Sequence, residues 1–112
     1  QRWKYMSNLK SEFWVKAYLK RLSLEGVSGF VVHHGDDDAG DLLIKISTLD
    51  GVAQLFQREY DLETGQRVWN CTFSGSEEDA DVSVKKKLGF DPDLWILEVE
   101  DVQARNFLDS MV

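Results

Sequence analysis

Between residues 27 and 73, four β-rich segments follow one another with short polar connections. The second segment, "DLLIKIST", alternates apolar and polar side chains, and an Asp-Gly pair between the second and third gives a strong hairpin signal. In the fourth, "RVWNCTF", the same alternation places Trp69, Cys71 and Phe73 on one side, so we expect Cys71 to be buried. Short connections favour antiparallel pairing of successive strands. We therefore predict a four-stranded antiparallel meander.

A helix is predicted before these strands, over residues 11–25. Its apolar side chains recur at intervals of three and four residues, which is the period of one helical face. The members of this stripe are Trp14, Val15, Tyr18, Leu19 and Leu22. We expect Ser11 to cap the N-terminus of the helix and Gly26 to end it.

A second helix is predicted after the strands, over residues 76–89. Ser76 is its expected N-cap, and Gly89 its expected end. Acidic residues at 77–79 and lysines at 85–87 complement the two ends of the helix dipole. These two charge runs are therefore explained by helix formation alone.

The segment "LWILEVE", residues 94–100, predicts the last strand. Its continuous apolar start indicates burial on both faces, hence an interior position in the sheet, while its direction is left open. The predicted fold is a single-domain α+β protein in the order α-β-β-β-β-α-β. Its five-stranded sheet is antiparallel-dominated, with two helices packed on one face. The domain spans residues 9–112, and residues 1–8, which include an internal Met6, are read as an N-terminal extension or a cloning remnant.

Charge and cysteine content limit the partners. The net charge of −7 and pI near 4.7 disfavour nucleic-acid binding. A basic patch on the first helix (Lys10, Lys16, Lys20 and Arg21) keeps that alternative open. No apolar run reaches the length of a membrane span, and the single cysteine fits a reducing cytoplasm. We expect a cytoplasmic protein that binds neither nucleic acid nor membranes.

The stretch "HHGDDDAGD", residues 33–41, is the most conspicuous candidate site. His33 and His34 point to opposite faces of a strand and cannot easily bind one metal ion. Counting from Asp36, an EF-hand would need oxygen ligands where Gly40 stands and Glu where Ser47 stands. Asp and Gly also suit a tight connection. We therefore favour a solvated hairpin loop over a weak site for a divalent cation or a cationic partner.

We predict that this loop and the sheet edge form an interaction surface. The candidate residues are His33, Gly35, Asp36, Asp37, Asp38, Gly40 and Arg105. The expected function is a non-enzymatic binding or regulatory module with an unidentified protein partner, a homodimer being one form of it, and no cofactor. The alternative is a small enzyme that uses carboxylates near the strand ends with a His or Arg. The pair Glu98 and Glu100 is read first as the solvent-facing side of a strand, or as partners of Lys45 and Arg58 across the sheet.

Four segments also resemble a known family: "LKSEFWVKAYLKR", "GDDDAGDLLIK", "GQRVW" and "FDPDLWILEVED...RNFLD". Together they resemble the domain-of-unknown-function family numbered 1491, found mainly in alphaproteobacteria, from Leu9 to Asp109. The family commonly has an arginine pair at His33 and His34, and often Asp-Arg-x-Gly-Arg-His where residues 101–106 here read Asp-Val-Gln-Ala-Arg-Asn. These departures replace most charged side chains that a shared site would use. The resemblance implies a compact cytoplasmic bacterial protein and no assigned activity.

Overall fold

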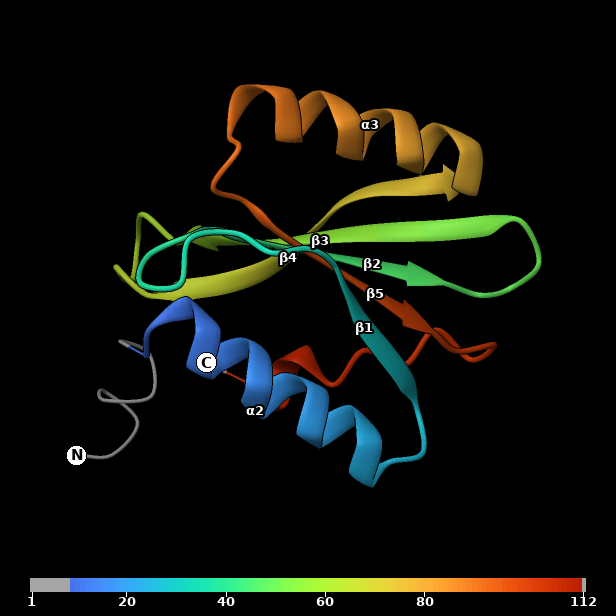
Figure 1. Ribbon diagram of the computed structural model, residues 1–112, viewed down its shortest axis with the longest axis horizontal. Helices are drawn as coiled ribbons and strands as arrows, with labels where there is room; N and C mark the ends of the chain where they lie inside the picture. The colour runs from blue at the N-terminus through green and yellow to red at the C-terminus, as the bar shows by residue number, and fades with distance from the viewer. Residues whose placement is uncertain (1–8, 112) are drawn as a thin grey trace.

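A mixed five-stranded sheet lies between two helices in the computed structural model, which describes residues 9–111 (Figure 1). The predicted extension at residues 1–8 lies outside the described residues. The elements are α2 (Ser11–Leu24), β1 (Ser28–His33), β2 (Leu42–Ser47), β3 (Val52–Tyr60), β4 (Arg67–Ser76), α3 (Glu77–Phe90), β5 (Trp95–Glu100) and the short 3-10 helix η1 (Leu108–Ser110). The predicted α+β class and the order α-β-β-β-β-α-β are confirmed.

The strand order in the sheet is β1-β5-β2-β3-β4. β5 pairs antiparallel with β1 and parallel with β2, while the β2–β3 and β3–β4 pairs are antiparallel. The interior position predicted for the last strand is therefore confirmed. The predicted four-stranded meander is wrong, because β5 lies where β1 was expected to meet β2. Only β2, β3 and β4 form a meander.

The two helices cover opposite faces of the sheet, so their predicted placement on one face is wrong (Figure 1). On one face, Trp14 and Tyr18 of α2 pack against side chains that include Ile44 and Leu97. On the other, Ala80 of α3 packs with residues such as Leu43. The physical reason is that all of β2 is buried, so each face needs a covering helix.

Helix α2 forms from the predicted stripe, and its buried side chains include Trp14, Tyr18 and Leu22. Gly26 follows its end with a φ of 71°, a conformation that suits glycine. The predicted cap is wrong: Ser11 lies inside the first turn, and its hydroxyl donates to the carbonyl of Gly40 at 2.6 Å. The start of α2 is thus fastened to the 34–41 loop.

Helix α3 begins as predicted, because the Ser76 side chain accepts a hydrogen bond from the Asp79 backbone N–H at 3.1 Å. It does not end at Gly89 but continues to Phe90. Pro92 disfavours helical backbone at Asp91, which explains the later end.

A β-bulge in β4 changes which side chains share a face. Leu55 pairs with Phe73 and the next residue, Phe56, pairs with Cys71, so one residue of β4 is left over between them. Trp69 consequently packs in the α2-side core and Phe73 in the α3-side core. Cys71 is exposed, contrary to the expectation of burial.

Candidate functional site

The 34–41 loop crosses the start of β5 instead of forming a hairpin. Its backbone is held by hydrogen bonds from Asp36 N to Asp93 O (2.9 Å) and from Trp95 N to Asp41 O (2.8 Å). The Trp95 indole also donates to Asp36 O at 2.7 Å. Because Asp36 near one end and Asp41 at the other are both hydrogen-bonded to the segment that begins β5, the loop is a fixed part of the fold.

Gly35 and Gly40 are required for this close approach. A Cβ atom at Gly35 would lie 2.2 Å from the Asp93 carbonyl oxygen, and one at Gly40 would lie 2.5 Å from the same atom. Any side chain at either position would collide with backbone, which cannot move without displacing β5. Both glycines of the predicted surface therefore have a structural role.

The loop aspartates point to separate partners. Asp36 accepts from the backbone N–H groups of Asp38 and Ala39, as in an Asx turn. The Asp37 carboxylate lies 2.6 Å from His34 Nε2, and that of Asp38 lies 3.5 Å from Lys10 Nζ. Within residues 9–111, no group of three or more His, Cys, Asp or Glu side chains is placed to hold a metal ion.

The two histidines also have separate environments. His33 is half-buried, with Nδ1 2.8 Å from the Leu94 carbonyl oxygen. His34 is more exposed, and its ring lies against Trp95 with the centroids 4.0 Å apart. Each imidazole is therefore held by a local partner, and the two do not form one site.

Arg105 is not brought to this loop. It follows the far end of β5, where its guanidinium makes two hydrogen bonds to Asp101 at 2.9 and 3.0 Å. This contact holds the pKa of Asp101 below its usual range. The structure thus gathers the predicted surface residues at the 34–41 loop, with Arg105 excepted.

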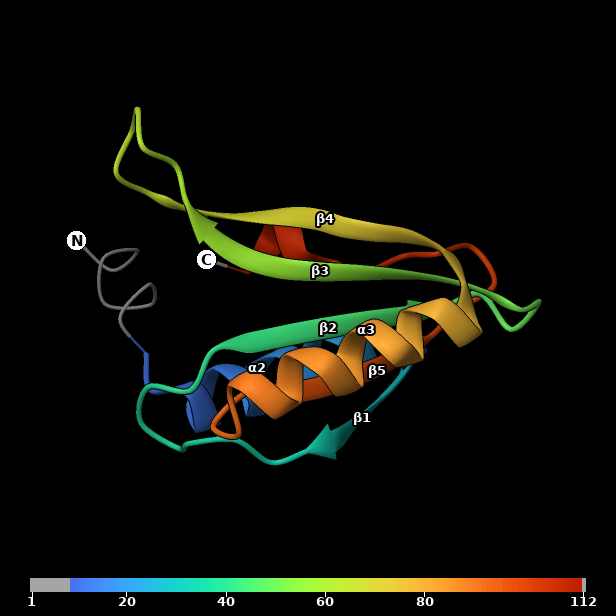
Figure 2. The same ribbon diagram turned by 90° about the horizontal axis from the view of Figure 1, so that it is seen from above.

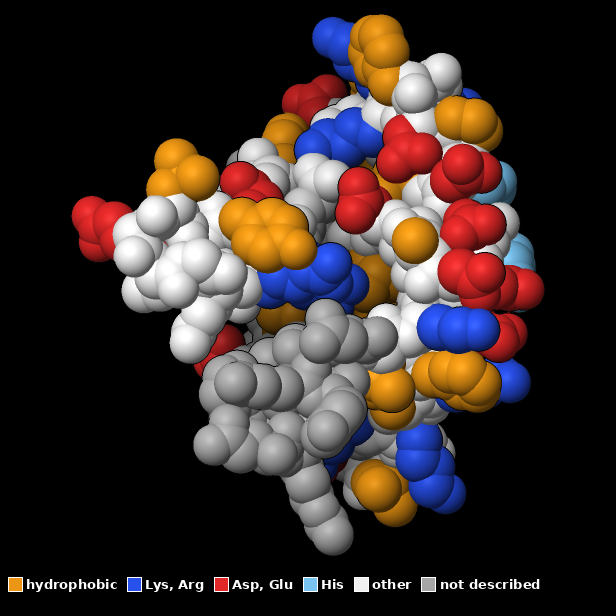
Figure 3. Space-filling model, turned by 90° about the vertical axis from the view of Figure 1, so that its left-hand side faces the viewer, with side chains coloured by type: hydrophobic (Ala, Val, Ile, Leu, Met, Phe, Trp, Pro, Cys, Tyr) orange, Lys and Arg blue, Asp and Glu red, His pale blue; other side chains and the backbone are white. Residues whose placement is uncertain are grey.

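A recess of about 150 Å³ opens beside the loop. It is lined by residues 38–41, by Leu9 and Ser11 around the start of α2, and by Arg58 and Arg67. Figure 3 shows this end of the molecule, with Lys and Arg side chains in the middle of the face between hydrophobic side chains. Figure 2 shows how the β3–β4 arm, which carries both arginines, extends beyond the rest of the sheet. We name this feature the arginine recess.

Arg58 is half-buried against aromatic rings. Its guanidinium carbon lies 5.8 Å from the ring centroids of both Trp14 and Trp69, which are 5.2 Å from each other. Burial, and then the charge of Arg67, lower the pKa of Arg58 to about 10. One of the two alternatives for Glu98 and Glu100, a partnership with Arg58, is wrong, because Arg58 lies on the side of the sheet that carries the α2 core.

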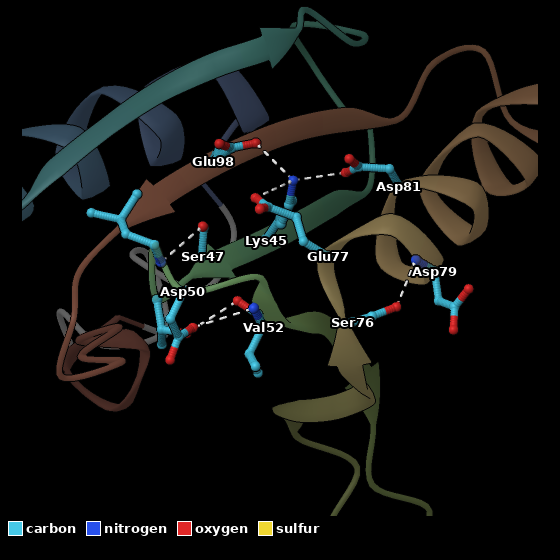
Figure 4. A network of polar contacts seen from close by, with 11 residues as sticks. Lys45, Ser47, Asp50, Val52, Ser76, Glu77, Asp79, Asp81 and Glu98 are labelled. Atoms are coloured by element: carbon cyan, nitrogen blue, oxygen red, sulfur yellow. Dashed lines mark hydrogen bonds and ion pairs between the residues drawn. The ribbon is translucent and has the colours of Figure 1, made fainter.

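A second polar cluster surrounds Lys45 on the α3 face (Figure 4). The ammonium lies 2.7 Å from Asp81, 3.1 Å from Glu77 and 3.2 Å from Glu98. The Lys45 side chain is only 7% exposed. Burial lowers the pKa of Lys45, but the three carboxylates outweigh it and raise the pKa above its usual value. The predicted Lys45–Glu98 pair is observed, and it joins α3 to the centre of the sheet.

The family model for "Protein of unknown function (DUF1491)" matches residues 9–109 of this sequence. The chain belongs to the DUF1491 family. A crystal structure of a DUF1491 protein from Caulobacter crescentus is similar, with 34% identity, a TM-score of 0.82, and coverage of 89% of this chain and 94% of that one. An NMR structure of a family protein from the same species has 32% identity, a TM-score of 0.77 and coverage of 89% and 92%.

Protein Atu0922 from A. tumefaciens is also similar, at 25% identity, with a TM-score of 0.72 and coverage of 83% of this chain and 86% of that one. No curated protein matches the sequence. Within the described part of the chain, no helix combines the length and apolarity that crossing a membrane requires. The family assignment confirms the predicted resemblance and brings no activity with it.

The arginine recess was missed in the sequence because its walls come from distant segments. One signal was present: Arg58 follows Phe56 by two residues, so the alternation of β3 places a charge on a core-facing side. A charged residue on a buried face calls for a partner or a role. The sequence therefore shows a charged residue on a buried face, but it does not show that the 34–41 loop and the start of α2 lie beside that residue.

Proposed function

We propose that this DUF1491 protein is a non-enzymatic binding module that uses the 34–41 loop and the arginine recess to hold a protein partner. The observation that carries this proposal is the recess itself, where two arginines without a carboxylate within 4.0 Å in residues 9–111 line a hollow beside the fixed loop. Hydrogen bonds already position the loop, so binding would cost little ordering entropy.

The surroundings of the recess support a protein contact. Tyr60 is 64% exposed and Leu62 is 98% exposed on the β3–β4 arm beside it. Arginine and aromatic side chains are enriched where protein interfaces gain most of their affinity. Aspartates 37 and 38 stand on the other side and would help to orient a partner of complementary charge.

No observation favours the alternative of a small enzyme built on strand-end carboxylates. Such a site needs a carboxyl group that is free to exchange a proton. Glu98 is bonded to Lys45, and the pKa of Asp101 is lowered by Arg105. These groups are arranged as ion pairs that hold elements together.

The test is affinity capture from a lysate of the source cell, with three variants beside the wild type. Arg58→Gln/Arg67→Gln removes the recess charges, and Asp37→Asn/Asp38→Asn changes the loop. Lys85→Gln/Lys86→Gln on α3 makes the same charge change as the first variant at a distant exposed site. We expect a stoichiometric partner that both site variants lose and the α3 control retains. A partner captured equally by all forms would show that neither the 34–41 loop nor the arginine recess binds it.

A further inference from the structure

We propose that the arginine recess binds an oxyanion group, a carboxylate or a phosphate, through Arg58 and Arg67. This inference rests on the proposed binding role and names the chemistry that the recess recognises. The group belongs either to a small molecule or to the side chain of a partner.

The arginines of the described chain divide into two kinds. Arg21 is paired with Glu25, and Arg105 with Asp101. Arg58 and Arg67 have no carboxylate within ion-pair distance in residues 9–111, and both line the same recess. Residues 1–8 contain no Asp or Glu that could supply one. The two arginines that form no ion pair within residues 9–111 therefore lie at the same recess.

Both guanidinium groups lie beside aromatic rings, which favour their position before any ligand arrives. Arg58 is fixed by the rings of Trp14 and Trp69. Arg67 lies over Tyr60, 5.4 Å from the ring centroid, and its Nε is 3.4 Å from the tyrosine hydroxyl. Planar guanidinium groups bind carboxylate and phosphate through paired N–H donors, and prior positioning reduces the entropy lost on binding.

The cost of burying the positive charge of Arg58 also favours an anion in the recess. A half-buried cation beside another cation is disfavoured, and the lowered pKa of Arg58 records this cost. The indole N–H groups of Trp14 and Trp69, on the rings that flank Arg58, are buried and have no hydrogen-bond acceptor in the described chain. An oxyanion in the recess would add negative charge beside Arg58, which Asp41 alone does not compensate.

The size of the recess limits the ligand. A volume of about 150 Å³ is close to that of five water molecules and well below a pocket for a drug-sized ligand. It admits the end of a molecule, such as one carboxylate or phosphate group with a few waters. Asp38 and Asp41 on the rim disfavour a large, highly charged anion.

The test is an NMR titration of the ¹⁵N-labelled full chain with sodium acetate and, separately, sodium phosphate, at an ionic strength held constant with NaCl. The indole N–H signals of Trp14 and Trp69 and the Nε–H signal of Arg58 are followed. We expect saturable shifts with at least one anion, with a Kd of the order of millimolar for an isolated group. The anion that binds more tightly distinguishes a carboxylate site from a phosphate site.

Arg58→Gln should weaken this binding by tenfold or more, and Arg58→Lys, which keeps the charge but not the paired donors, should weaken it partly. Arg21→Gln removes the same charge on α2 away from the recess and should leave binding unchanged. Retained dispersion of the amide spectrum shows that each variant folds. Shifts that do not saturate, or that persist in Arg58→Gln, would overturn the inference.

The outcome is separable from that of the proposed function. A partner lost with the arginine variant, without saturable shifts for either anion, would overturn the oxyanion site while leaving the binding module. Saturable anion binding without any captured partner would support the oxyanion site and contradict the proposal that the module binds a protein.

Discussion

Replacing Lys45 with methionine leaves three carboxylates near one another without their cation. Glu98 is 19% exposed, and losing a charge-assisted hydrogen bond to such a group costs about 1.5–3 kcal/mol. Glu77 and Asp81 are 34% and 55% exposed, so water screens them and each contributes at most about 1 kcal/mol. Methionine keeps most of the packing of the lysine stem. We expect the free energy of unfolding to fall by about 3 kcal/mol, which lowers Tm by roughly 12 °C in a domain of this size.

The assay is urea unfolding followed by tryptophan fluorescence, at several pH values. In the wild type, the raised pKa of Lys45 means that its contribution is fully present below the ordinary lysine pKa and is lost as the pH rises through the folded-state value.

Lys86→Met, on the exposed side of α3, is the control and should change stability by less than about 0.5 kcal/mol. If Lys45→Met were as stable as the wild type at neutral pH, the cost of burying the ammonium would equal its gain from the carboxylates. The cluster would then not be what holds α3 to the sheet.

Gly35→Ala should lower stability by about 2–4 kcal/mol in thermal unfolding because of the collision with the backbone at the start of β5, whereas Gly89→Ala, one residue before the end of α3 where an added Cβ has open space, should raise it by up to about 1 kcal/mol. Equal effects would contradict the close-approach argument. The lowered pKa of Asp101 gives stability that is present above its ordinary pKa and lost as the pH falls through the folded-state value. Arg105→Gln should therefore lower the urea midpoint at pH 7 more than at pH 3, and a constant difference would refute this. If the binding module takes the form of a homodimer, we propose that it pairs through the free edge of β1, so Val32→Lys should yield monomers in sedimentation equilibrium; a monomeric wild type at high concentration would exclude this pairing.

The elements could be predicted because their signals are local. The spacing of Trp14, Tyr18 and Leu22 identifies α2, and Ser76 identifies the start of α3. The pairing of strands could not be predicted, since nothing near β1 indicates that β5 will lie beside it. Lys45 also misled the interpretation of β2, because a lysine in an alternating strand normally indicates a solvent-facing side. Here its charge is met by carboxylates from two other elements, and that face is buried.

The candidate surface was only partly predictable, because it too depends on contacts between segments that are distant in the chain. The 34–41 segment stood out by composition, and its residues do lie together. The role of Gly35 depends on the distant Asp93 carbonyl, and the arginine recess depends on Arg58 meeting Trp14 across the sheet. Such contacts join segments that are far apart in the chain, so periodicity and capping rules say nothing about them.

The insertion of β5 between β1 and β2 has a consequence for biosynthesis. While residues up to about 90 leave the ribosome, β1 and the outer edge of β2 have no neighbour, because their common partner begins at Trp95. The nascent chain can form α2 and the β2–β4 meander, but it exposes two open strand edges that favour mispairing. Closure of the sheet therefore waits for the C-terminal segment. A stop codon before Trp95 would remove the strand that joins β1 to β2 and leave β1 without its native partner.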